Sequence, residues 1–244
     1  MKASHADQTE LLRLQAADTR LAQLAHAAKN LPQAVELAKL QPEVDALRAR
    51  WISATGELED ARAELKRIES DVEIVEARAK RDSDRVQQSA SMKDVQALEQ
   101  ELASLTKRKN DLEEIELTVM ERVEGLEQAL AAVEAERAEL SARVEVLEAQ
   151  RDEEAAKLEA QRKALVADRS TIAGALPADL IELYERQRAR YGIGAAALIR
   201  GVSMGSNVSL TESDLAEIRR AAADEVVLCP DSGAILVRGE DSGL

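Results

Sequence analysis

The sequence has very few aromatic residues, and this shortage excludes some kinds of protein at the outset. Only 1% of its 244 residues are aromatic, and phenylalanine is absent. Because pockets for small substrates are lined mainly by large apolar and aromatic side chains, we expect no small-molecule substrate. Glycine and proline are also scarce, at 10 and 4 residues, while 33% of the residues are charged. This composition is typical of long helices and coiled coils rather than of one globular core.

Other absences bear on location and activity. One cysteine cannot form an intramolecular disulfide framework. No apolar run reaches the roughly 18 residues needed to cross a bilayer, and the first ten residues lack the apolar core of a signal peptide. The motifs G-x-x-x-x-G-K and H-E-x-x-H, which mark common nucleotide and metalloprotease sites, are missing. We therefore expect a cytoplasmic protein without membrane contact, cofactor or enzymatic activity.

The charge balance disfavours strong binding to nucleic acids. The net charge is −14, and acidic residues outnumber basic ones both in the first two thirds of the chain and in the remainder. Neutralising phosphate groups requires a basic excess, which is lacking here. A small local basic patch stays compatible with these numbers.

Apolar residues recur at every third or fourth position along most of the chain, which predicts coiled-coil helices. Pro32 interrupts the pattern after the first helix, and Pro42 is expected to kink the second helix or to mark a late start. The polar stretch RDSDRVQQSAS predicts a turn at about residues 82–91. The expected helices span residues of about 5–31, 33–81 and 92–173.

The helix lengths predict an antiparallel hairpin. At 1.5 Å per residue the three helices measure roughly 40, 70 and 120 Å, so the first two together match the third. With the tip near residues 82–91, the second helix pairs with the near half of the third and the first helix covers the far half. Residues 1–173 then form one coiled-coil hairpin.

Residues 174–244 have a different character and predict a small α+β module. Gly174 and Pro177 end the long helix, and the segment PADLIELYERQRARYG follows as a linker helix. AAALIRGV and NVSL predict short strands, TESDLAEIRRA a helix with Thr211 as N-cap and Asp214 completing a capping box, and EVVLCPDSGAILVR a β-hairpin. The fold class is therefore mostly α, with a zinc-ribbon-like α+β module at the C-terminus. The expected core residues of this module are Val202, Val208, Leu210, Leu215, Ile218, Val226, Leu228, Ile235 and Val237.

The segments GVSMGSNVSL and LCPDSGAIL carry the spacing of a four-cysteine zinc ribbon, but only one of the four ligand positions holds cysteine. Structural zinc sites require thiolates or imidazoles, and serine hydroxyls are poor ligands. His5, at a start expected to be flexible, and His26, outside the apolar seam, cannot complete the set. We predict a degenerate, metal-free site. In it, Cys229 is the one ligand position that still holds cysteine in the tight turns (knuckles) of a zinc ribbon, rather than a reactive thiol. The degenerate ligand positions are Ser203, Ser206, Cys229 and Ser232.

The ordered set of segments resembles a widespread bacterial family with a coiled-coil hairpin and a C-terminal four-cysteine zinc ribbon, in the form typical of actinobacteria. LLRLQAADTRLAQLAHAAKNLP is similar to the opening helix of that family, and KDVQALEQELASLTKRKNDLEEIELTVMERVEGLE to its helix after the tip. LYERQRARYGIGAAALIRG and DEVVLCPDSGAILVR resemble its linker and last knuckle. The resemblance implies a non-enzymatic adaptor. In that family some members are implicated in nucleic-acid binding through the ribbon. Others are implicated in partnering sigma factors, secretion or flagellar components through the coiled coil.

Three hypotheses for function follow. The leading one is an adaptor that binds protein partners through a coiled-coil rod and a metal-free ribbon-like module. A nucleic-acid-binding regulatory protein is the first alternative, and a spacer or self-associating rod is the second. The candidate contact residues for nucleic acid or a partner are Arg186, Arg188, Arg190, Arg200, Arg219 and Arg220.

We predict that the purified protein contains no stoichiometric zinc and that its C-terminal module is folded regardless. Three hydroxyls and one thiol cannot form a closed tetrahedral site of useful affinity. Elemental analysis checks the metal content, and a chelator should leave the thermal melt unchanged. One zinc ion per chain, or a melt lowered by the chelator, would contradict this prediction.

Overall fold

The computed structural model describes all 244 residues, and most of the chain is helical. The three long helices are α1 (His5–Lys29), α2 (Pro32–Gln88) and α3 (Met92–Ala175). They lie close to the ranges that the apolar periodicity predicted. No helix contains an apolar stretch long enough to traverse a membrane.

The predicted turn at 82–91 is too long. Helix α2 continues to Gln88, and only residues 89–91 separate it from α3. The segment contains neither glycine nor proline, and Asp82 forms ion pairs with Arg78 and Arg85 within the helix, at 3.9 and 3.4 Å. Such pairs at spacings of three and four support a helix. Pro42 lies inside α2, so the alternative of a late helix start is wrong.

The chain packs as two compact units, and their boundary differs from the predicted division at residue 173. The first unit combines Met1–Val35 with Ala149–Leu244, and the second is Glu36–Glu148. The predicted division followed the change in sequence character. The structure instead groups α1 and the end of α3 with the C-terminal residues, because these segments share one apolar core.

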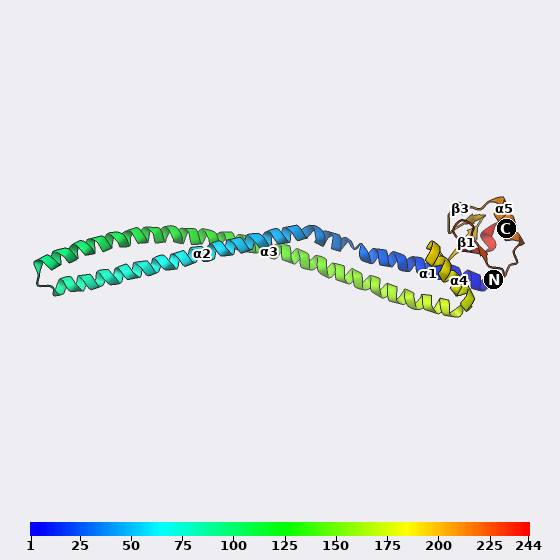
Figure 1. Ribbon diagram of the computed structural model, residues 1–244, viewed down its shortest axis with the longest axis horizontal. Helices are drawn as coiled ribbons and strands as arrows, with labels where there is room; N and C mark the ends of the chain where they lie inside the picture. The colour runs from blue at the N-terminus through cyan, green and yellow to red at the C-terminus, as the bar shows by residue number, and fades with distance from the viewer. The chain divides into compact units, whose positions relative to one another are not determined.

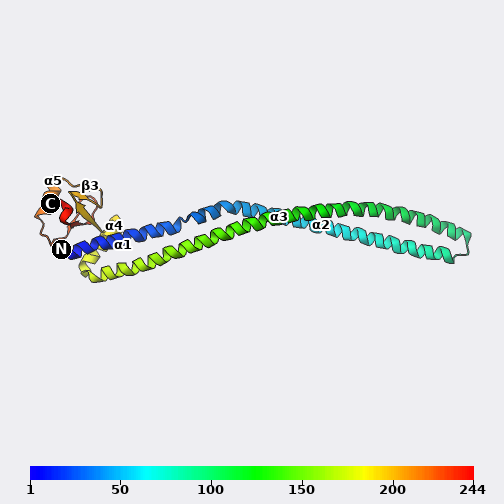
Figure 2. The ribbon, with the colours of Figure 1, turned by 180° about the vertical axis from the view of Figure 1, so that it is seen from behind.

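In the second unit, α2 and α3 form an antiparallel hairpin (Figures 1 and 2). Its best-packed stretch is a cluster of four buried residues, and Trp51 packs partly buried against it. Arg137 lies over the Trp51 ring, 4.8 Å from its centre, where a cation is attracted by the aromatic face. The four buried residues are Leu40, Leu47, Val133 and Leu140.

Ion pairs between the two arms follow the hairpin toward its tip. Their N–O distances are 2.6 or 2.7 Å, and the side chains are largely exposed. Exposed pairs each contribute only about 0–1 kcal/mol. Opposite charges at matched heights nevertheless favour this register over shifted ones. The pairs are Arg50–Glu136, Arg62–Glu127, Glu64–Arg122 and Glu76–Lys109.

The first unit contains a five-stranded sheet with the order β3-β2-β1-β5-β4. Neighbouring strands are antiparallel except β1 and β5, which are parallel. Besides α1 and the end of α3, the unit contains the helices α4 and α5 and a short 3₁₀ segment. Thr211 and Asp214 form the predicted capping box at the start of α5. The elements are α4 (Ala178–Tyr191), β1 (Ala195–Ile199), β2 (Val202–Ser203), β3 (Val208–Ser209), α5 (Glu212–Arg220), β4 (Val227–Leu228), β5 (Ile235–Arg238) and η1 (Glu240–Ser242).

Two apolar clusters stabilise this unit. One joins Leu11 and Leu14 of α1 to Leu180 and Tyr184 of α4 and to the sheet. The other lies between α5 and the sheet and includes Leu198, Leu215, Ile218, Cys229 and Leu236.

The predicted core of the C-terminal module needs two corrections. Leu210, Leu215, Ile218, Ile235 and Val237 are buried as expected. Val208 and Leu228, in contrast, are 51% and 43% exposed. Both lie in two-residue strands at the edges of the sheet. The sequence pattern of such short strands cannot show which side is covered.

The N-terminal residues are ordered, which corrects the expectation of a flexible start. Ser4 caps α1 by accepting a hydrogen bond from the Asp7 backbone N–H at 3.1 Å. Ala3 donates its N–H to the Asp224 carbonyl at 2.8 Å, and Val226 donates to the Met1 carbonyl at 3.1 Å. The first residues therefore pair with the segment before β4.

A buried carboxylate connects three helices of the first unit. The side chain of Asp18, on α1, is only 4% exposed. It accepts hydrogen bonds from Arg169 Nε on α3 and from the Tyr184 hydroxyl on α4, both at 2.7 Å. Arg188 Nη1, also on α4, lies 2.7 Å from the same carboxylate. Burial and the adjacent carboxylate raise the pKa of Tyr184, so its hydroxyl stays a donor.

Asp18→Asn should lower the free energy of unfolding of the first unit by about 3–5 kcal/mol, as for other broken buried ion pairs. The neutral amide leaves the Arg169 and Arg188 guanidinium groups with Glu185 as their one remaining shared carboxylate. Tyrosine near-ultraviolet dichroism reports this unit, which contains both tyrosines, while fluorescence of Trp51 reports the second unit. The exposed Asp60 provides the control: Asp60→Asn should change stability by less than about 0.5 kcal/mol. Equal changes in the free energy of unfolding for the two variants would show that the buried network stabilises the unit no more than an exposed carboxylate does.

Candidate functional site

The candidate site consists of the four degenerate ligand positions, which we call the knuckle cluster: Ser203, Ser206, Cys229 and Ser232. Ser203 ends β2 and Cys229 follows β4 directly. The Cys229 thiol donates a hydrogen bond to Ser203 Oγ at 3.2 Å. Both residues are buried, at 2% and 0% exposure. Two positions that are separated along the chain therefore meet inside the fold.

The two turns of the knuckle cluster lie in contact, as the sequence predicted. A β-carbon added at Gly205 would lie 2.9 Å from Ser232 Oγ, so a side chain at this position would displace the second turn. Gly233 has a φ of +68°, and its N–H donates to the Cys229 carbonyl at 3.0 Å. Glycine is the residue best suited to this left-handed conformation. The glycines thus permit the close approach of the turns.

Ser206 departs from the expected pattern. Its hydroxyl oxygen is buried but has no hydrogen-bond partner. Ser232 Oγ instead accepts a bond from the Ala234 backbone N–H at 3.4 Å. The hydroxyl–thiol bond between Ser203 and Cys229 is thus the direct side-chain hydrogen bond between the two turns.

The donor set of the knuckle cluster does not fit zinc. Burial raises the pKa of Cys229, but hydrogen bonding with Ser203 and Ser232 outweighs this effect, so the pKa is lowered overall. The other three positions offer only neutral hydroxyls, which are poor ligands for zinc. No group of three or more His, Cys, Asp or Glu side chains is arranged to hold a metal ion. We therefore derive no metal-dependent step from this site.

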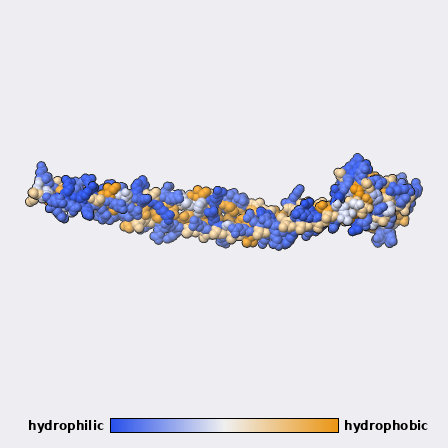
Figure 3. Space-filling model, turned by 90° about the horizontal axis from the view of Figure 1, so that it is seen from below, coloured by the Kyte–Doolittle hydropathy of each residue, from blue (hydrophilic) through white to orange (hydrophobic).

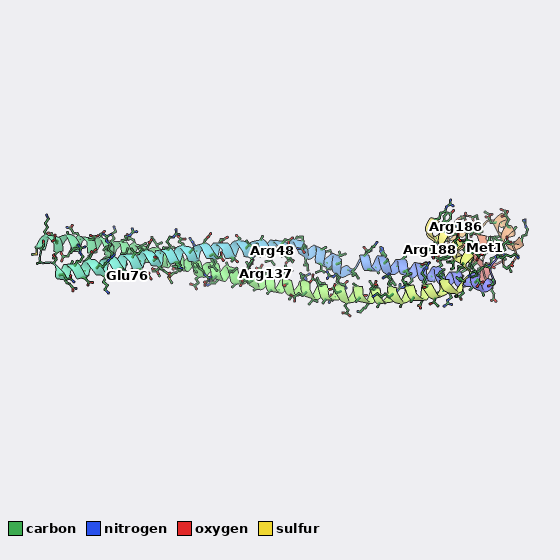
Figure 4. All side chains as sticks on the ribbon, turned by 60° about the horizontal axis from the view of Figure 1, so that its bottom comes forward. Met1, Arg48, Glu76, Arg137, Arg186 and Arg188 are labelled. Carbon is green, nitrogen blue, oxygen red and sulfur yellow. The ribbon has the colours of Figure 1, made fainter.

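The three candidate arginines on α4 are engaged with neighbouring groups to different degrees (Figure 4). Arg188 pairs with Asp18 at 2.7 Å and with Glu185 at 3.1 Å. Arg186 lies 4.0 Å from Glu182, and Arg190 stacks over the Tyr191 ring, 5.1 Å from its centre. Arg188 is therefore part of the buried network and is a poor candidate for contacting a ligand.

The remaining three candidate arginines lie on other elements. Arg200 lies in the turn between β1 and β2 with a positive φ of 49°. Arg219 and Arg220 form the last turn of α5, where cations interact favourably with the helix dipole. The six candidate arginines therefore come from three separate elements: α4, the turn between β1 and β2, and α5.

Sequence reasoning missed Arg238, which is the most extensively bonded side chain of the C-terminal residues. Its guanidinium donates to the carbonyls of Ala221 at 2.9 Å, Ala222 at 2.7 Å and Glu225 at 2.7 Å. These carbonyls follow α5 and lead toward β4. The residue is an isolated arginine at the end of a strand, and no local motif indicates that it stabilises this connection.

An apolar groove on the hairpin was also missed. It encloses about 220 Å³ between α2 and α3 in the second unit. Arg48 of α2 and Arg137 of α3 border it (Figure 4). Both side chains are free of salt bridges, in contrast to the ion-paired arginines nearer the tip. The apolar lining residues are Val44, Leu47, Leu140 and Val144.

These features define a coiled-coil hairpin protein with a small strand-containing C-terminal part, and comparisons with known proteins agree. Residues 14–192 match the CT398-like coiled-coil hairpin domain. The protein Rv2229c of Mycobacterium tuberculosis is 36% identical over 98% of both chains. The chain therefore belongs to the CT398-like coiled-coil hairpin family.

Solved structures extend the similarity to the fold. A protein from Mycobacterium smegmatis matches with a TM-score of 0.85 and 33% identity, covering 98% of this chain and 100% of its own. CT398 from Chlamydia trachomatis matches with a TM-score of 0.64 and 20% identity, covering 96% and 98%. At that identity CT398 supports the fold alone.

Restoring the missing thiols should create a metal site. We predict that the triple variant Ser203→Cys, Ser206→Cys and Ser232→Cys binds one zinc ion per chain and melts at a lower temperature after chelation. The physical reason is that the two turns are already in contact, so four thiolates complete a tetrahedral set. The matched control replaces the same three serines with alanine and should bind no zinc. Failure of the cysteine variant to bind zinc, with its fold intact, would show that the four positions do not converge.

Proposed function

We propose that this protein is a non-enzymatic adaptor that binds protein partners through its hairpin and its metal-free, ribbon-like C-terminal module. The observation that carries the proposal is the groove between α2 and α3, where the partly buried Val44 and Val144 flank the buried Leu47 and Leu140 of the seam. Accessible apolar side chains that are rimmed by polar residues mark interaction sites in many proteins. The arginines at its border favour a partner with acidic groups next to apolar side chains.

The surrounding surface supports a specific contact at the groove. On the face shown in Figure 3, hydrophilic residues cover most of the hairpin, and apolar patches are small and separated. Acidic residues dominate the chain, with 47 against 33 basic ones. A site bordered by two arginines without salt bridges therefore differs in charge from its surroundings. An acidic partner is repelled elsewhere and attracted here.

The nucleic-acid alternative has weaker support. A net charge of −14 opposes the approach of phosphate, and Arg188 is held by Asp18. Exposed stacking residues are also few, since Tyr184 is buried and Tyr191 is covered in part by Arg190. The second alternative, a spacer or self-associating rod, requires contact between copies of the chain.

The adaptor proposal predicts that capture of partners depends on the groove. Val144→Lys places a charge in the groove, whereas Val146→Lys places the same charge on a side chain that is already 56% exposed. Affinity capture from a native extract, followed by binding assays with the purified partners, should show losses of about tenfold or more for Val144→Lys only. Helix content measured by circular dichroism verifies that both variants are folded. Equal binding by both variants would contradict a role for the groove.

Two further measurements separate the alternatives. Gel shifts over a salt series should show no nucleic-acid binding even at low salt. A steep salt dependence that disappears when Arg186, Arg190, Arg200, Arg219 and Arg220 are replaced by alanine would favour the nucleic-acid hypothesis instead. A molar mass in solution above that of one chain, rising with concentration, would favour the self-associating rod.

A further inference from the structure

A second groove lies in the first unit, between α5 and the edge strand β4. It encloses about 350 Å³. Its apolar lining includes Ile218, Val227 and Leu228, the last of which is 43% exposed. Its polar lining is entirely acidic, from Asp214, Glu217 and Glu225.

Two of the three carboxylates are free to meet a ligand. Asp214 accepts hydrogen bonds from the Thr211 hydroxyl and backbone N–H, so it is used in capping α5. Glu217 and Glu225 form no salt bridge. The basic residues of the same helix, Arg219 and Arg220, do not line the groove. The groove therefore presents more negative than positive charge beside apolar surface, with Lys2 as the nearby cation that acts on Glu225. This arrangement attracts a cationic group with an apolar neighbour.

The backbone of β4 is open toward this groove. Strand β4 is the last in the sheet and pairs only with β5, with Val227 opposite Leu236 and Leu228 opposite Ile235. Ile235 donates its N–H to the Gly194 carbonyl on the other side, at 2.9 Å. The backbone groups of successive residues in a strand point to opposite sides. Since Ile235 points toward β1, Leu236 points toward β4 and pairs with Val227. The N–H and C=O of Leu228, the next residue of β4, therefore point away from β5. Neither group of Leu228 has a partner in the structure.

The N-terminal residues of the chain already pair with the neighbouring part of this edge. Just before β4, residues 1–3 lie antiparallel to residues 224–226, with Lys2 opposite Glu225. The Lys2 ammonium group forms an ion pair with Asp224 at 2.9 Å. An extended segment with a lysine thus already occupies the adjacent part of the edge. Its hydrogen bonds end at Val226, two residues before Leu228, whose N–H and C=O are free.

We propose that the groove between α5 and β4 binds an extended segment of a partner protein, carrying lysine or arginine, as an added strand beside Leu228. The free N–H and C=O of Leu228 bind the partner backbone. Glu217 and Glu225 bind its basic side chains, and the alternate side chains pack on Ile218 and Leu228. This form of recognition takes affinity from backbone hydrogen bonds and specificity from side chains. The inference deepens the proposed adaptor function by naming a partner class for the C-terminal residues.

The test uses the full chain and a capped six-residue peptide of alternating lysine and valine, with an alternating glutamate and valine peptide as the comparison. Titration followed by fluorescence anisotropy should show binding of the basic peptide only, weakening as salt is added. The double variant Glu217→Lys and Glu225→Lys should lose about tenfold or more in affinity for the basic peptide and should gain affinity for the acidic one. The charge-matched control, Glu182→Lys with Glu240→Lys, replaces exposed carboxylates outside the groove and should leave both affinities unchanged.

Two measurements test specifically whether the peptide binds as an added strand. Binding should slow hydrogen exchange of the Leu228 amide, and a basic peptide methylated on alternate backbone nitrogens should bind about tenfold more weakly or worse. Equal loss of binding in the groove and control variants would show a general charge effect and overturn the proposal. So would equal binding of the methylated peptide or an unchanged Leu228 amide. This assay does not involve the hairpin groove, so failure of either proposal is recognised independently of the other.

Discussion

The buried carboxylate of Asp18 is the interaction on which the arrangement of the first unit depends. A charge that is 4% exposed is costly to bury unless several groups compensate it. Arg169, Arg188 and Tyr184 supply that compensation from α3 and α4. Beside it, Gln15 of the same helix accepts a hydrogen bond from the Gly194 N–H at 2.7 Å, just before β1. One face of α1 therefore positions the end of the hairpin, the linker helix and the start of the sheet together.

This arrangement explains how the small sheet of the first unit holds its shape. A zinc ion would cross-link the two turns directly, whereas here they meet through the bond between Ser203 and Cys229 and through close packing. The greater stabilisation comes from outside the turns. Tyr184 is fully buried against Gly194, where even an added β-carbon would lie 2.4 Å from its ring. Small domains that lack a staple need this kind of external packing.

The two grooves proposed as contact sites differ in the charge at their borders. The groove beside Arg48 and Arg137 favours acidic groups, while the groove beside Glu217 and Glu225 favours basic ones. An adaptor with sites of opposite charge discriminates between its partners by repulsion as well as attraction. The two sites lie in different compact units, so each is available for substitution without altering the other.

The sequence by itself determined the helices, the capping box at Thr211 and Asp214, and the two knuckle turns, because periodicity and turn chemistry are local properties. Only the tertiary structure decided which distant groups meet. Asp18 and Arg169 are 151 positions apart, and on the sequence each is one charged residue among many on a helix. Exposure of Leu228 likewise follows from its place at the edge of the sheet, since a two-residue strand carries no readable alternation. Local patterns specify which element forms and which face is apolar, but the partner of each face is set by the packing of the whole unit.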